Sequence, residues 1–150
     1  RYNLFLQEKY LLVKGSFSME VNNIRSILSN KFHEAQSIMD KKEKVLNVVS
    51  KGIKATASTS WAKKYKKDIE LMGMMITDYV KNDYEYLNKS TIVIAISALL
   101  YIISPINKIT DKIPFLKDID NIAVITFALH AIREELKTYK LWLNTKNLRK

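Results

Sequence analysis

The feature that most restricts the fold is a stretch of 18 residues without a charge, from Ser90 to Asn107. Alanine, leucine and isoleucine dominate it, and Pro105 ends the helix they favour, because proline disfavours helical geometry at the residue before it. About 15 helical residues remain, or about 22 Å at 1.5 Å per residue. A membrane-spanning helix needs about 20 residues. The stretch therefore predicts a short helix buried in a protein core, with a shallow membrane hairpin as the alternative.

Three more segments have the spacing of amphipathic helices. In each, apolar or aromatic residues recur at steps of three and four, which places them on one helix face. The last of these seams follows the charge-free stretch, and Asp118 or Asp120 is expected to cap its helix. Ser60 is the expected cap of the helix that starts with Trp61. The seams run from Ile24 to Ile38, from Trp61 to Tyr79 and from Ile122 to Leu143.

The composition favours helices over strands, because 150 residues contain three glycines and two prolines. After the first 18 residues, no stretch has the alternation of a half-buried strand. We therefore expect an all-α fold, with four to six helices packed around a central hydrophobic helical hairpin. The corner of that hairpin, residues 104–120, is rich in proline and aspartate.

The polar stretch from Thr56 to Ser60 is the expected linker between two parts of the chain. We expect a helical arm over residues 19–60 and a helical domain over residues 61–150. Residues 1–18 lack a clean period, and Met19 is a candidate start. We interpret residues 1–18 as derived from a longer precursor or from an expression vector.

The corner carries a family resemblance. From Trp61 to about residue 145 the chain resembles the YkvA-like domain, a small bacterial helical domain of unknown function. The family pattern reads Ser-Pro-Ile-Asp, Ile-Pro-Asp, Ile-Pro, a glycine and Asp-Asp. Its first and last aspartates are Asn107 and Asn121 here, and its glycine is Lys117. The matching residues are Ser104, Pro105, Ile106, Ile109, Asp111, Ile113, Pro114 and Asp120.

These corner residues have two interpretations. Aspartate and asparagine near a helix end satisfy free backbone groups in caps and turns, and proline fixes φ at a bend, which predicts a rigid structural corner. The alternative is a weak divalent-metal site. A divalent cation needs several anionic oxygens, and two acids of the family pattern are neutral here, so we predict neither a metal nor a cofactor. The side chains of the alternative site would be Asn107, Asp111, Asp118, Asp120 and Asn121.

The net charge of +10 is concentrated in one segment. Residues 41–67 contain nine lysines and one acid, Glu43, and such a field attracts phosphates of lipid headgroups or of nucleic acid. Trp61 would add an aromatic anchor at a membrane interface, or a surface on which bases stack. The alternatives are that the lysines form a solvated face and that Trp61 belongs to the core. The candidate polyanion-binding residues are Trp61, Lys63, Lys64, Lys66 and Lys67.

We find no pattern of catalytic residues. His33 and His130 lie far apart in the sequence, there is no cysteine, and three glycines make no phosphate-binding loop. The sequence predicts a non-catalytic adaptor that acts at or near a membrane surface from the cytoplasmic side. Its expected partner is a protein or an anionic membrane surface, with no small-molecule substrate. A basic nucleic-acid-binding domain and a divalent-metal-binding domain are the two alternatives.

Overall fold

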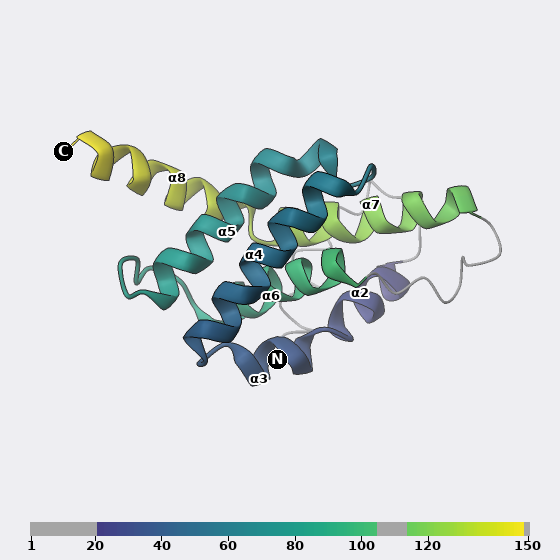
Figure 1. Ribbon diagram of the computed structural model, residues 1–150, viewed down its shortest axis with the longest axis horizontal. Helices are drawn as coiled ribbons and strands as arrows, with labels where there is room; N and C mark the ends of the chain where they lie inside the picture. The colour runs from purple at the N-terminus through teal and green to yellow at the C-terminus, as the bar shows by residue number, and fades with distance from the viewer. Residues whose placement is uncertain (1–20, 105–113, 149–150) are drawn as a thin grey trace.

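The computed structural model describes residues 21–104 and 114–148, which form α-helices joined by short turns (Figure 1). These residues contain no strand, and only Ile132 separates α7 from α8. If α7 and α8 are counted as one helix interrupted at this residue, the described part of the chain has six α-helices, and the predicted all-α fold of four to six helices is confirmed. The elements are α2 (Val21–Ser29), α3 (Phe32–Ile38), α4 (Lys42–Ser58), the 3-10 helix η2 (Lys63–Tyr65), α5 (Lys66–Val80), α6 (Lys89–Ile103), α7 (Pro114–Ala131) and α8 (Arg133–Leu148).

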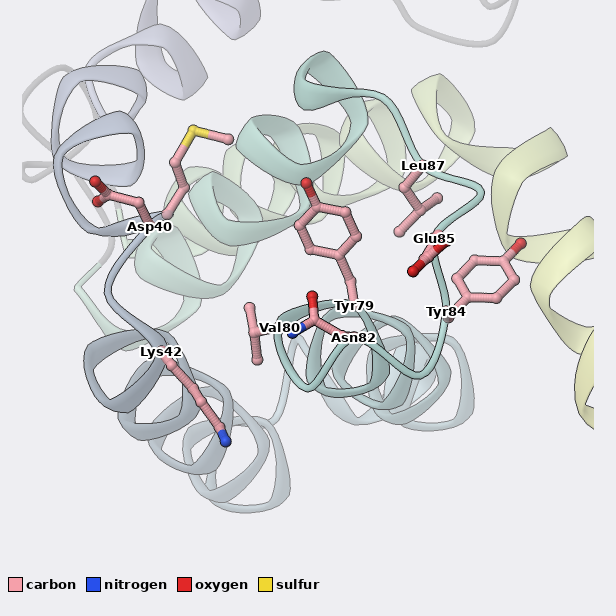
Figure 2. Close-up of a pocket in the computed structure, with 9 residues that line it drawn as sticks. Asp40, Lys42, Tyr79, Val80, Asn82, Tyr84, Glu85 and Leu87 are labelled. Atoms are coloured by element: carbon pink, nitrogen blue, oxygen red, sulfur yellow. The ribbon is translucent and has the colours of Figure 1, made fainter.

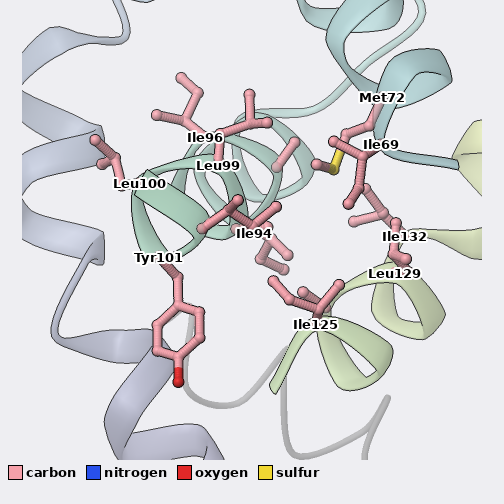
Figure 3. Close-up of a cluster of buried hydrophobic side chains, with 14 of the residues drawn as sticks. Ile69, Met72, Ile94, Ile96, Leu99, Leu100, Tyr101, Ile125, Leu129 and Ile132 are labelled. Atoms are coloured by element: carbon pink, nitrogen blue, oxygen red, sulfur yellow. The ribbon is translucent and has the colours of Figure 1, made fainter. Parts of the chain in front are cut away.

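Helix α6 lies at the centre of the fold. Every residue from Thr91 to Ile102 is buried, because this helix has no charged side chain to keep in water after Lys89. It packs against α2, α3, α4, α5 and α7. Figure 3 shows Ile94 of α6 in the same cluster as Met72 of α5 and Ile125 of α7. The charge-free stretch therefore supplies the central element of the core.

Helices α6 and α7 form the predicted hydrophobic hairpin. They pack on one another, and the hydroxyl of Tyr101 in α6 donates a hydrogen bond to the side-chain oxygen of Asn121 in α7. Within the described ranges, no helix combines the length and the apolar character that crossing a membrane requires. The predicted corner residues Pro105, Asn107 and Asp111 lie outside the described residues.

Glycine lets α4 approach its two neighbours closely. A Cβ atom added to Gly52 would lie 2.7 Å from Cδ2 and 3.2 Å from Cβ of Leu99 in α6. A Cβ atom added to Gly73 in α5 would lie 3.1 Å from Cγ1 of Val49 in α4. Real Cβ atoms do not fit at the first of these distances, so α4 can lie where it does on α6 because residue 52 has no side chain.

The helices before and after residue 60 share one hydrophobic core. Ile24 and Val49 belong to the same buried cluster as Ile69 and Tyr139. Helix α4 packs against both α5 and α6. The predicted boundary between an arm and a domain therefore falls between elements that depend on each other for burial.

Two expectations about the chain near residue 60 are wrong. Helix α4 continues to Ser58, and Thr56 is buried with its hydroxyl donating to the carbonyl of Gly52 at 2.8 Å, so the linker is shorter than predicted. Ser60 does not cap a helix. The next helical turn begins at Lys63, and neither η2 nor α5 has a side-chain cap.

The predicted start of α7 is also wrong. The helix begins at Pro114, so Asp118 and Asp120 lie within it and do not cap it. Proline suits the first position of a helix because its missing N–H would have no intrahelical partner there and its φ is already helical. The start of α7 is therefore at a proline of the family pattern and not at an aspartate.

Candidate functional site

The candidate site is built on four lysines at the turn between α4 and α5. We call Lys63, Lys64, Lys66 and Lys67 the basic corner, and all four are exposed. The local fold explains this arrangement, because the preceding Trp61 and Ala62 are buried and anchor the turn to the core. The lysines that follow are left on the outside. The basic corner is therefore presented by a short segment whose backbone position is fixed by apolar burial.

Little of this positive charge is neutralised within the described part of the chain. Lys66 Nζ lies 3.9 Å from Glu70 Oε1, but both side chains are well exposed, and such a pair contributes little. Lys64 Nζ lies 5.5 Å from the centre of the Tyr65 ring. The last turns of α4 add Lys51 and Lys54, which are also exposed. The surface around the basic corner therefore keeps a positive potential.

Trp61 does not share this exposure. Only 8% of the residue is accessible, and its ring packs edge-on against Tyr101, with ring centres 6.3 Å apart. Of the three interpretations of Trp61, as a membrane anchor, a surface for base stacking or a core residue, the structure supports the core residue. Little of the indole is left to contact a lipid interface or a base.

Tyr65 links the basic corner to α7. Its ring is half-buried, and its hydroxyl lies 2.6 Å from the hydroxyl of Thr126. Tyr65 stands between Lys64 and Lys66 in the sequence, so this hydrogen bond holds the middle of the lysine cluster against the hairpin. The contact joins residues 61 positions apart, and no local pattern predicts it.

A groove that the sequence did not predict runs beside the basic corner. We call it the α5–α8 groove; its volume is about 460 Å³, and it lies between α5 and the junction of α7 with α8. One signal was present in the sequence: Arg133, Lys137 and Lys140 recur at steps of four and three, which places three cations on one face of α8. The lining residues are Tyr65, Asp68, Leu71, Thr126, Leu129, His130, Arg133, Leu136, Lys137 and Lys140.

A second hollow, of about 400 Å³, lies between the α3–α4 turn and the end of α5 (Figure 2). Tyr79, Val80 and Leu87 lie around it, and Asp40 and Glu85 stand on opposite sides. Its lining has no concentration of one charge, since Lys42 accompanies the two acids. The position of this hollow follows from the abrupt end of α5, where the chain turns back toward α6.

An aromatic cluster closes the neighbouring part of the fold. Tyr84 lies 5.0 Å from Tyr139 and 4.9 Å from Trp142, measured between ring centres. Tyr139 donates its hydroxyl to Asp78 Oδ2 at 2.5 Å. Burial, followed by this hydrogen bond and the charge of Asp78, raises the pKa of Tyr139. Burial, followed by the nearby Tyr86 and Glu135, raises the pKa of Tyr84.

Of the residues predicted for the family corner, the structure describes the side chains of Ser104 and Asn121. Ser104 is exposed at the end of α6, Pro114 opens α7, and Asn121 is buried with Tyr101 as its hydrogen-bond donor. Among the side chains that the structure describes, which leave out those of residues 105–120, no three His, Cys, Asp or Glu residues lie together as metal ligands would. His33 is exposed on α3, and His130 is half-buried in the lining of the α5–α8 groove.

Comparison with known proteins places this chain in a family. A family model described as "Protein of unknown function (DUF1232)" matches residues 91–127, which cover most of α6 and much of α7. A relative in Bacillus subtilis (strain 168), called "Uncharacterized membrane protein YkvA", is 31% identical over 102 residues, which make up 68% of this chain and 96% of the relative. No solved structure matches the chain. The chain therefore belongs to the YkvA-like family of DUF1232 proteins.

Proposed function

We propose that this chain is a non-catalytic helical interaction module that docks on the anionic cytoplasmic face of a membrane through its basic corner. The observation that carries the proposal is the exposure of all four lysines, Lys63, Lys64, Lys66 and Lys67, on a turn anchored by buried Trp61. The Bacillus relative is called a membrane protein, which agrees with an association of this chain with membranes.

The expected strength of such docking is modest. A basic residue near an anionic bilayer contributes about 1 kcal/mol, so four lysines contribute on the order of 4 kcal/mol. That free energy corresponds to a Kd of about 1 mM. Docking of this kind is reversible, and it depends on further contacts or on a protein partner that binds at the same time. Leu141 and Leu148 of α8 are exposed apolar side chains that suit such a partner.

Nucleic acid is the alternative ligand, and the position of the aromatic rings favours lipid. Binding of single strands relies on exposed rings on which bases stack. Trp61 is buried, and the hydroxyl of half-buried Tyr65 is engaged by Thr126, so the basic corner lacks a free stacking surface of this kind. Attraction to lipid headgroups requires charge alone.

The non-catalytic part of the proposal rests on the chemistry of the side chains. The chain has no cysteine, and its two histidines, His33 and His130, lie on different helices. Ser104, the serine of the family pattern, lies at the exposed end of α6, where serine is typical of a turn. The sequence around His33, Ser104 and His130 contains no motif that joins a nucleophile to a base and an orienting group, as acyl or phosphoryl transfer requires.

The test is co-sedimentation with vesicles of equal parts phosphatidylglycerol and phosphatidylcholine. The wild type should bind them at low salt and should not bind pure phosphatidylcholine vesicles. Changing Lys63, Lys64, Lys66 and Lys67 to Glu should abolish binding. These side chains are exposed, so the helical circular dichroism should not change.

The matched control changes four other exposed lysines to Glu, and both variants lower the formal net charge from +10 to +2. The control should keep most of the binding if the basic corner is the docking site. Equal loss in both variants would contradict the proposal, and so would a wild type that binds only DNA or RNA in a parallel mobility-shift assay. The control lysines are Lys41, Lys42, Lys44 and Lys81.

A further inference from the structure

We propose that the α5–α8 groove is a binding site for an individual anionic phospholipid, which places an acyl chain against the leucines of the groove and its phosphate among the cations at the edge. The inference deepens the proposed function and rests on it, because it names the membrane component that the docked protein would recognise. It comes from the groove itself, which shares Tyr65 with the segment that carries the basic corner.

The base of the groove is apolar. Leu129 and Leu136 are its least exposed lining residues, with 9% and 7% of their surface accessible, and Leu71 is half-buried beside them. A volume of about 460 Å³ lies in the range of about 300–1,000 Å³ that is typical of ligand sites. An acyl chain in this position would cover the exposed part of Leu71 and the small part of Leu129 and Leu136 that is still in contact with water.

The edge of the groove is positively charged. Arg133, Lys137 and Lys140 of α8 are exposed and line it, against one acid, Asp68 of α5. Arg133 lies 3.6 Å from Glu134, but both side chains are well exposed, so this pair removes little of the attraction for a phosphate. An apolar base with a cationic edge complements an amphiphile that has an apolar chain and an anionic head.

The groove also continues into the docking surface. Tyr65, which lines the groove, lies between Lys64 and Lys66 of the basic corner. Asp68 and Leu71 follow one and two turns later on α5. A protein that rests on a bilayer with its basic corner therefore has the groove beside the headgroup layer. This geometry favours a lipid over an acidic amphipathic peptide, which would also fit the charge pattern.

The experiment measures the binding of monomeric myristoyl lysophosphatidylglycerol, below its micelle concentration, to the full chain by isothermal titration calorimetry. Two comparisons need no variant. Lysophosphatidylcholine with the same chain should bind about tenfold more weakly or worse, because it carries no net charge. The headgroup alone, glycerophosphoglycerol, should show no measurable binding. Equal binding of either compound would overturn the proposal.

The first variant changes Lys137 and Lys140 to Glu and should weaken lysophosphatidylglycerol binding about tenfold or more. Its matched control changes Lys81 and Lys89 to Glu, which alters the net charge equally at exposed sites away from the groove. The control should stay within about twofold of the wild type. Equal weakening in the two variants would overturn the proposal.

A second variant, Leu71→Trp, fills the groove with a ring and should also weaken lysophosphatidylglycerol binding, while the thermal unfolding transition remains cooperative. If this variant folds and its affinity for lysophosphatidylglycerol is unchanged, the proposal that an acyl chain lies in the groove is overturned. A third result would also overturn the proposal. In it, the wild type binds an acidic amphipathic helical peptide but not the lysophospholipid, and the changes at Lys137 and Lys140 abolish binding of the peptide.

Failure of this inference can be told apart from failure of the proposed function. The basic-corner variant, with Lys63, Lys64, Lys66 and Lys67 changed to Glu, should lose vesicle binding and keep the affinity for the monomeric lysophospholipid within about threefold, since none of the four lines the groove. Vesicle binding without lysophospholipid binding would overturn the groove site alone. Lysophospholipid binding without vesicle binding would overturn the docking function and leave the groove site supported.

Discussion

Tyr101, near the end of α6, donates its hydroxyl to the side-chain oxygen of Asn121 in α7, and both residues are buried. This bond ties the two helices of the hairpin together close to the corner that carries the family pattern. Asn121 stands where that pattern has its last aspartate. The amide oxygen accepts this hydrogen bond without carrying a charge, so joining the helices does not require a charged group to be buried.

Tyr101→Phe should therefore lower the free energy of unfolding by about 1–3 kcal/mol, because it leaves the Asn121 oxygen buried without this donor. Urea unfolding followed by circular dichroism measures the change. Tyr86→Phe is the control, since Tyr86 is 75% exposed and should change stability by no more than about 0.5 kcal/mol. Equal stabilities of the two variants would show that the bond contributes nothing.

Gly52→Ala tests the close approach of α4 to α6. Alanine favours a helix by about 1 kcal/mol over glycine, but its Cβ would lie 2.7 Å from Leu99 Cδ2. We expect the contact to outweigh the helix preference, so that the variant is destabilised by about 1–3 kcal/mol.

The control for this effect is the double variant Gly52→Ala, Leu99→Ala. Removal of the Leu99 side chain beyond Cβ makes room for the new methyl group, so the double variant should lose less stability than the two single variants together. Additive losses would mean that Leu99 is not the obstacle. Gly73→Ala should cost less than Gly52→Ala, because its nearest contact would be 3.1 Å.

The sequence predicted the helices of the hairpin well, because an uncharged stretch of 18 residues can be buried whole and a seam at steps of three and four needs a partner. It predicted the helix ends poorly. Ser60 is a good capping residue, but burial of Trp61 and Ala62 holds the chain in a turn there, and α5 starts later. A local preference of about 1 kcal/mol is easily overridden by such packing.

The candidate site could be predicted only in part, because the sequence shows residues that are neighbours along the chain but not those that packing brings together. The basic corner is contiguous in the sequence, so Lys63 to Lys67 stand out as a run of charge. The α5–α8 groove joins Asp68 and Leu71 to residues near Lys137, and only the packing of α5 on α8 brings them together. For Trp61 the neighbours in the sequence were misleading. The adjacent lysines suggested a surface anchor, whereas the Trp61 ring packs on Tyr101.

Asp120→Ala tests the corrected start of α7. An N-cap would lose about 0.5–2 kcal/mol on this change. Because α7 begins at Pro114, residue 120 lies inside the helix, where alanine is favoured over aspartate by up to about 0.7 kcal/mol. Chemical denaturation should therefore show an unchanged or slightly higher stability. A loss in the range expected for a cap would contradict the start at Pro114.

Asn82 is tested by a pair of substitutions. It has a positive φ of 63°, and the N–H of Asp83 donates to the carbonyl of Asp78 at 2.8 Å, which is the pattern of a helix end closed by a left-handed residue. Asn82→Gly should leave stability equal or slightly higher, whereas Asn82→Ala should lower it by about 1 kcal/mol. Thermal unfolding of the two variants measures the difference, and equal midpoints would contradict the left-handed conformation.

The last prediction concerns alkaline pH and Tyr139. Burial and the hydrogen bond to Asp78 raise the pKa of Tyr139 above its ordinary value in the folded protein. Below about pH 10 the tyrosine is protonated in both states, and its contribution to stability is complete. Above that pH the unfolded chain loses the proton first, so the free energy of unfolding falls by up to about 1.36 kcal/mol per pH unit.

Tyr139→Phe should remove this part of the pH dependence and should also lower stability at neutral pH, because Asp78 loses a donor. Urea unfolding at a series of pH values from neutral to strongly alkaline, for the wild type and the variant, measures both effects. The two proteins share every other ionisable group, so the difference between the two curves isolates the contribution of Tyr139. The curves should converge as pH rises above about 10. Parallel curves over the whole range would contradict the raised pKa of Tyr139.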